Sequence, residues 1–287
     1  MRAKVNGIEI EYETFGAPEA PLVVLISGFS QQLTSWDPAF CGQLASKGLR
    51  VVRFDNRDVG LSSKIEGGPR PKLAAIAGGD LSTQSYTFDA MADDTAGLIE
   101  ALGASAAHVV GVSMGGMIGQ TLAIRTPARV KSLVSIMSTT GDRSVGYGAP
   151  DTLALMAERA PTERAANIEH GVRVWRKLQS NGFAHDEAQA RARIGLNFDR
   201  SFSPEGVARQ LAALLGQANR TEALARLRIP TTVIHGADDS LIHVSGGEAT
   251  ARAIPGAKLV VVPGMGHELP EGAWPIVIDA VVRQARA

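Results

Sequence analysis

The sequence predicts an α/β fold, in which a mostly parallel central sheet carries helices on both faces and one helical segment is inserted. Two observations lead to this prediction. Short, fully apolar runs alternate with stretches of helical periodicity along most of the chain, which is the pattern of a parallel sheet covered on both sides. The alternation stops near residue 139 and resumes near residue 220.

The first 138 residues carry five expected strands and three expected helices. An Asn6-Gly7 hairpin turn precedes the first of these strands, whose residues alternate between polar and apolar. The strands are Ile8–Thr14, Leu22–Ile26, Leu49–Phe54, Ala107–Val112 and Val130–Met137. The helices are Asp37–Lys47, Phe88–Leu102 and Met114–Ile124, and glycine ends the first two, at Gly48 and Gly103.

Residues 139–219 contain no buried-strand pattern, and turn clusters divide them into four helical stretches. These are Thr152–Arg159, Glu163–Leu178, Asp186–Ile194 and Pro204–Leu215. Strands then return at Thr231–His235 and Lys258–Val262, with helices at Ser245–Ala253 and Gly272–Arg286. We therefore expect one core built from residues 1–138 and 220–287, and an insertion of residues 139–219. Ligands of open parallel sheets bind beyond the carboxyl ends of the strands, so this insertion is expected to form a helical cap there.

Composition excludes several classes of protein. The 29 Lys and Arg residues balance 29 Asp and Glu residues, and only 5% of the chain is aromatic, which argues against a nucleic-acid partner. Cys41 is the single cysteine, so neither an internal disulfide nor a thiolate metal cage can form. We expect no cofactor and no metal. The N-terminus lacks the apolar stretch of a secretory signal, and no apolar run could cross a bilayer, which predicts a cytoplasmic protein without stable membrane insertion.

The segment Gly111-Val112-Ser113-Met114-Gly115-Gly116 matches the pattern G-x-S-x-G between an expected strand and an expected helix. So sharp a strand-to-helix turn strains the serine backbone, and glycine is needed two positions away on either side to avoid collisions. Ser113 is therefore the candidate nucleophile. The amide of Met114, at the helix N-terminus, is a candidate oxyanion donor.

A serine hydroxyl needs a general base and an acid that orients it. Of the six histidines, His267 follows the last buried strand in a loop of small residues, and His243 is the alternative on the same side of the sheet. After strand Thr231–His235 the chain reads Gly236-Ala237-Asp238-Asp239. We choose Asp239 as the acid, with Asp238 as the alternative and Asp142 as a more distant candidate. The order Ser, Asp, His along the chain is that of α/β-hydrolases.

A second oxyanion donor is expected in the loop after Leu22–Ile26, where the chain reads Ser27-Gly28-Phe29-Ser30. Gly28 allows the backbone to turn toward the site, and the amide of Phe29 is the candidate donor. Three apolar residues are candidates for lining a substrate pocket: Trp36, Met137 and Trp175.

These motifs resemble the α/β-hydrolase superfamily over nearly the whole chain. Together, Phe54-Asp55-Asn56-Arg57-Asp58, the Ser113 segment and Gly264-Met265-Gly266-His267-Glu268 are similar to bacterial carboxylesterases grouped with aclacinomycin methylesterase. The resemblance implies ester hydrolysis, a cap between the sixth and seventh strands, and an architectural role for Asp55 and Arg57. Asp58 stands where this family usually has glycine, and Ser27 stands where many relatives have histidine.

The sequence therefore predicts a serine carboxylesterase that cleaves small neutral esters through a Ser-His-Asp triad and an acyl-enzyme. A lactonase, a perhydrolase or a carbon–carbon bond hydrolase would use the same triad. A ligand-binding module with low turnover is the alternative from a different class. The expected partner is a small ester substrate, and a homodimer is compatible with the sequence.

Overall fold

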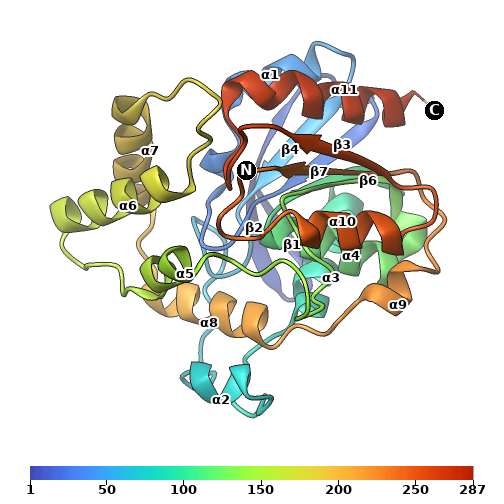
Figure 1. Cartoon of the computed structure of the whole chain (residues 1–287). Coiled ribbons are helices and arrows are strands. Elements are labelled where there is room, and N and C mark those ends of the chain that lie inside the picture. The colour runs from blue at the N-terminus through green and yellow to red at the C-terminus, as the bar shows by residue number, and fades with distance from the viewer. Residues whose placement is uncertain (287) are drawn as a thin grey trace.

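A computed structural model describes residues 1–286 (Figure 1). Eight strands form one sheet in the order β1-β2-β4-β3-β5-β6-β7-β8. Strand β2 is antiparallel to β1 and β4, and all other neighbours are parallel. The strands are β1 (Arg2–Val5), β2 (Ile8–Phe15), β3 (Leu22–Ile26), β4 (Arg50–Phe54), β5 (Ala107–Val112), β6 (Val130–Ile136), β7 (Thr231–Gly236) and β8 (Lys258–Val262). The predicted α/β fold class is confirmed.

Helices cover both faces of the sheet because the central strands are apolar on both sides. Helices α1 (Pro38–Ala45) and α11 (Trp274–Ala285) pack on one face, where they lie side by side in Figure 1. Helices α3 (Phe88–Ala101), α4 (Met114–Arg125) and α10 (Ser245–Ala253) pack on the other face. Two short helices, α2 (Leu73–Ala77) and α9 (Thr221–Leu224), and three 3-10 turns, η1 (Leu33–Ser35), η2 (Pro127–Arg129) and η3 (Glu271–Ala273), complete this part of the chain.

The insertion lies between β6 and β7 and contributes four helices. These are α5 (Pro150–Ala157), α6 (Arg164–Leu178), α7 (Glu187–Arg200) and α8 (Pro204–Leu215). Figure 1 shows α6 and α7 beside each other, away from the sheet. Helix α7 continues past Ile194, where the expected helix ended, to Arg200. A Cβ on Gly171 of α6 would lie 2.8 Å from the side chain of Ile194 on α7, so glycine at this position lets the two helices approach closely.

Both ends of the insertion meet at a buried arginine. The guanidinium of Arg220 donates to the carbonyl of Thr139 (3.0 Å) and to Oε1 of Gln120 on α4 (3.1 Å). The Arg220 amide donates to the carbonyl of Thr140 (2.9 Å). Arg220 therefore ties the chain entering the insertion to the chain leaving it, at the surface of the core.

Strand β5 contains a buried histidine that makes stability depend on pH. His108 is 6% exposed, and its Nδ1 lies 2.8 Å from the hydroxyl of Ser132 on β6. Burial, and then the charge of Lys131, lower the pKa of His108 from 6.5 to about 4. The unfolded chain binds this proton first, so folding stability is lost as the pH falls from 6.5 to about 4.

We expect the wild type to lose about 3 kcal/mol more unfolding free energy than a His108→Gln variant over this pH interval. Urea denaturation of both proteins at several pH values measures the difference. The carboxylates titrate equally in the two proteins, so parallel pH profiles would contradict this explanation.

The described residues, 1–286, include no helix long and apolar enough to span a membrane.

Candidate active site

Ser113 lies in a tight turn between β5 and α4. Its backbone is left-handed, with φ of 56° and ψ of −120°, and such strain in a non-glycine residue is typical of functional sites. The structure explains the glycines on either side of it. A Cβ on Gly111 would lie 2.2 Å from the carbonyl oxygen of Gly115, and a Cβ on Gly115 would lie 2.1 Å from that of Ile26. Only glycine fits at both positions.

His267 lies between Ser113 and Asp239. Its Nε2 is 3.0 Å from Oγ of Ser113, and its Nδ1 is 2.7 Å from Oδ2 of Asp239. A carboxylate only accepts hydrogen bonds, so Nδ1 carries the proton and the free Nε2 can accept the serine proton. The structure thus joins the three sequence-predicted residues into one hydrogen-bonded chain.

Asp239 is held by donors on both carboxylate oxygens. Its side chain is fully buried, and Oδ1 accepts from the amides of Leu241 (2.9 Å) and Ile242 (2.8 Å). Nε2 of His235 lies 3.3 Å from Oδ2 and 2.8 Å from the carbonyl of Ile242. Burial alone would raise the pKa of Asp239, but the imidazoles of His267 and His235 outweigh it and hold this pKa well below its usual range. The acid is therefore ionised at neutral pH.

The chain after α6 supports the loop that carries His267. The carbonyl of Leu178 accepts from the amide of His267 (2.9 Å), and Oγ of Ser180 accepts from the amide of Gly266 (2.9 Å). A Cβ on Gly266 would lie 2.6 Å from the Leu178 carbonyl oxygen, so glycine permits this approach. The insertion thus fixes the backbone on which the histidine sits.

The predicted oxyanion donors lie on two segments that meet at Ser113. Met114 is the first residue of α4, where amides have no partner within the helix. Gly28 lies against Ser113, since a Cβ on it would be 3.4 Å from the serine Cβ. The amide of Phe29 donates no hydrogen bond among the described residues. Both amides are therefore free to bind a developing oxyanion.

The alternative base and acids lie outside this hydrogen-bonded chain. His243 is exposed, and its Nδ1 lies 3.0 Å from the hydroxyl of Ser245. Asp238 is exposed beside the buried Asp239. Asp142 accepts from the amide and hydroxyl of Ser144, both at 2.8 Å.

The loop after β4 has the architectural contacts that the resemblance implies. Asp55 is buried and accepts from the amides of Leu33 (2.7 Å) and Leu61 (2.8 Å), so it braces two turns. Arg57 instead reaches α3, where it forms a two-point ion pair with Asp94, both contacts at 2.6 Å.

Ser27, in place of the histidine of many relatives, also has partners. Its Oγ donates to the carbonyl of Gln32 (3.4 Å) and accepts from the hydroxyl of Ser35 (3.1 Å). These contacts close the Phe29 loop without a histidine.

The three residues predicted to line a pocket lie in different surroundings. Trp36 is buried and stacks on Phe40, with ring centroids 5.6 Å apart. Met137 is buried in the same apolar cluster. Trp175, on α6, packs edge-on against His185. Their role in binding substrate stays a prediction.

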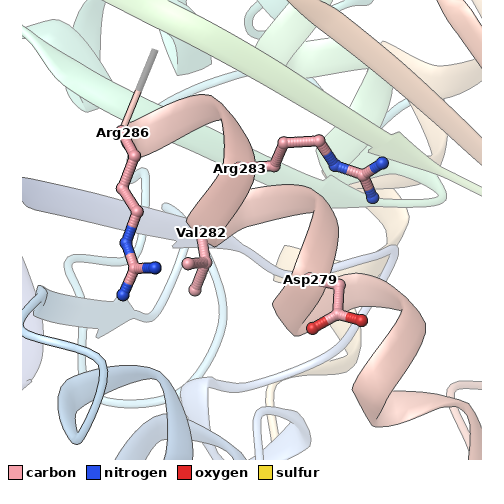
Figure 2. Close-up of a pocket in the computed structure, with 4 residues that line it drawn as sticks. All are labelled: Asp279, Val282, Arg283 and Arg286. Atoms are coloured by element: carbon pink, nitrogen blue, oxygen red, sulfur yellow. The ribbon is translucent and has the colours of Figure 1, made fainter.

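A hollow of about 600 Å³ on α11 lies far from this site. Figure 2 shows its lining residues, which are Asp279, Val282, Arg283 and Arg286. Gln284, on the same turn, donates to the hydroxyl of Thr232 (3.0 Å), near the amino end of β7. Ser113, Asp239 and His267 all follow carboxyl ends of strands. The hollow therefore lies near the amino ends of the strands, on the opposite side of the sheet from the site.

Comparisons with known proteins agree with this geometry. The family described as the alpha/beta hydrolase fold matches residues 21–272. The chain belongs to the α/β-hydrolase fold family. It is 29% identical to rhodomycin D methylesterase DauP of Streptomyces sp. (strain C5), over 96% of this chain and 94% of that protein.

Two solved structures share the fold along the whole chain. One is a thermophilic esterase from Thermogutta terrifontis, with a TM-score of 0.75, 26% identity, and coverage of 100% of this chain and 98% of that one. The other is the enol-lactonase from Burkholderia xenovorans LB400, with a TM-score of 0.78, 24% identity, and coverage of 100% of both chains.

Sequence reasoning missed the polar side chains that the insertion places against the core. Gln210 on α8 and Gln32 in the Phe29 loop are both buried, and each makes hydrogen bonds between the insertion and the core. A glutamine in an amphipathic helix carries no local signal for such a contact. The contact of Ser180 with the His267 loop was also missed. In the sequence, Ser180 belongs to the turn cluster Ser180-Asn181-Gly182, which predicts only the end of a helix.

Proposed function

We propose that this protein is a serine carboxylesterase that cleaves small neutral esters through an acyl-enzyme. The observation that carries the proposal is the hydrogen-bonded chain from Ser113 through His267 to Asp239. It combines a nucleophile, a base in the correct tautomer and a buried ionised acid, which are the parts of a serine hydrolase triad. The curated relative named a methylesterase supports ester cleavage as the reaction.

In the acylation step, Oγ of Ser113 attacks the ester carbonyl carbon while its proton passes to Nε2 of His267. The carbonyl oxygen becomes an oxyanion that accepts hydrogen bonds from the amides of Phe29 and Met114. Each such donor contributes roughly 3–4 kcal/mol to lowering the barrier. When the tetrahedral intermediate collapses, Nε2 of His267 returns the proton to the leaving alcohol.

Deacylation repeats these steps with water as the nucleophile. His267 removes a proton from water, which attacks the acyl carbon, and then protonates Oγ of Ser113 as the carboxylic acid leaves. Asp239 stabilises the imidazolium that forms in both halves of the reaction. The buried carboxylate needs no movement because the amides of Leu241 and Ile242 and Nδ1 of His267 already donate to it.

A neutral substrate is supported by the charges near the Phe29 loop, which are paired with each other. Arg200 pairs with Asp55 (2.7 Å), and Arg209 pairs with Asp58 (2.7 Å). A guanidinium engaged in this way is not available to bind a substrate carboxylate. We further propose that the insertion, residues 139–219, is a cap over this site, because its segment after α6 contacts the His267 loop.

The test is covalent labelling combined with a substrate panel. A fluorophosphonate probe is expected to label wild-type protein at Ser113, as located by peptide mass spectrometry. Simple methyl and p-nitrophenyl esters are expected to be hydrolysed faster than γ-lactones of similar size. Folded protein that takes no label would favour the binding module, and faster turnover of lactones would reassign the substrate class.

A further inference from the structure

We infer that Gln210, from the insertion, is a positioning residue for the oxyanion hole: it fixes the turn that presents the Phe29 amide. This inference rests on the proposed function, since it concerns the same oxyanion. Gln210 lies on α8 and is fully buried. Its Oε1 accepts from the amide of Ser30 (3.0 Å), and its Nε2 donates to the carbonyl of Arg57 (2.9 Å).

The Phe29 amide belongs to a turn with an unfavourable backbone. The amide of Gln31 donates to the carbonyl of Gly28 (3.2 Å), which closes a four-residue turn over residues 28–31. Ser30, at the third position, is left-handed with φ of 59°. This is the pattern of a type II turn, whose third position favours glycine because other residues are strained there. A serine stays in this conformation only when surrounding contacts hold it.

Gln210 supplies such a contact. Its Oε1 accepts the Ser30 N–H, which would point elsewhere if the central peptide of the turn flipped to a conformation preferred by serine. The Gly28 carbonyl and the Phe29 N–H share one trans peptide and point in opposite directions. With that carbonyl turned inward onto Gln31, the Phe29 N–H is left free, as the oxyanion hole requires.

The helix that carries Gln210 is itself held firmly against the core. The next residue toward the N-terminus, Arg209, forms two contacts with Asp58, at 2.9 Å and 2.7 Å. Asp58 is buried and left-handed with φ of 73°, which explains why glycine is usual at this position in the family. Here the carboxylate anchors the insertion instead. Consecutive residues of α8 thus bind consecutive residues of the core loop, Asp58 and Arg57.

A second glutamine, in the core, binds the insertion. Gln32, in the same loop as Phe29, donates to the carbonyls of Asn197 (2.7 Å) and Ser201 (3.0 Å) in the insertion, and its Oε1 accepts from Arg200 (2.7 Å). The loop is therefore bound to the insertion at Ser30 and again at Gln32. The insertion therefore holds the loop that supplies one donor of the oxyanion hole, in addition to lying over the site.

The experiment compares Gln210→Met with a matched control, a glutamine outside α8 whose side chain also binds this helix. Gln84→Met removes a glutamine whose Nε2 donates to the carbonyl of Ala212 on α8 (3.2 Å) without touching the Phe29 loop. We expect Gln210→Met to lower kcat for p-nitrophenyl butyrate by about 10- to 100-fold. This is less than the loss of about 100- to 1000-fold that follows removal of an oxyanion donor itself. KM should stay within about twofold of the wild-type value. Gln84→Met should keep both constants within about twofold of wild type.

A rescue separates positioning from a general effect on folding. Glycine adopts a positive φ without strain. The double variant Gln210→Met, Ser30→Gly is therefore expected to have a kcat at least about threefold higher than that of Gln210→Met alone. Should Gln210→Met not fold, Gln210→Asn replaces it in every comparison, since it stays polar but is too short to bridge Ser30 and Arg57.

Three results would overturn the inference: a folded Gln210 variant with wild-type kcat, an equal loss in Gln84→Met, or no recovery with Ser30→Gly. An inactive wild-type protein would instead reject the proposed function.

Discussion

Replacing Ser113 with alanine is expected to lower kcat for ester hydrolysis by about 10⁵- to 10⁶-fold, to a residual rate that depends on substrate binding and the oxyanion donors alone. The loss is this large because the triad acts as a unit: without Oγ, His267 has no nucleophile to activate. The fold should survive, since only the backbone of Ser113 holds the turn. Its amide N–H, for example, donates a hydrogen bond to the carbonyl of Ile136 (2.8 Å). Steady-state kinetics and thermal melting measure the two effects.

Ser138→Ala provides a control for the loss of a serine near the same sheet edge. Ser138 is buried after β6, and its side chain packs near Gly116 of α4. Its kcat should remain within about twofold of wild type. Turnover in Ser113→Ala within tenfold of wild type would exclude the acyl-enzyme route and leave His267 acting directly on water.

The juxtaposition of the three candidate catalytic residues could be predicted because each one lies in a short, contiguous signal. Ser113 has its glycines within two residues on either side, and the reason for them is local collision. Asp239 and His267 each follow an apolar strand, and parallel strands bring their carboxyl ends to one edge. Strand order along the chain was therefore enough to place three residues together that are up to 154 positions apart.

The supporting contacts could not be predicted because their partners are distant and leave no pattern. Ser30 and Gln210 are separated by 180 residues, and neither residue type is unusual where it stands. The left-handed backbone at Ser30 is equally hidden, because a serine in sequence does not signal a positive φ. The expected helix Asp186–Ile194 was too short, because an isolated glycine such as Gly195 is tolerated inside a helix and α7 runs to Arg200.

Replacing Asp239 with asparagine is expected to lower kcat by about 10⁴-fold while the fold is retained. The structure gives the reason atom by atom. The amides of Leu241 and Ile242 require an acceptor at the Oδ1 position, so the asparagine oxygen takes that place. Its NH2 group then faces Nδ1 of His267, to which it donates. The imidazole is forced to carry its proton on Nε2, and this nitrogen can no longer accept the proton of Ser113.

Asp238→Asn is the matched control for that variant, because it makes the same chemical change at the adjacent, exposed carboxylate. Its kcat should remain within about twofold of wild type, whereas Asp239→Asn should retain its melting temperature and still lose activity. NMR of the His267 ring nitrogens is expected to show the proton on Nδ1 in wild type and on Nε2 in Asp239→Asn. Equal activity losses in the two variants, or an unchanged tautomer with lost activity, would mean that Asp239 acts through local structure and not by orienting the base.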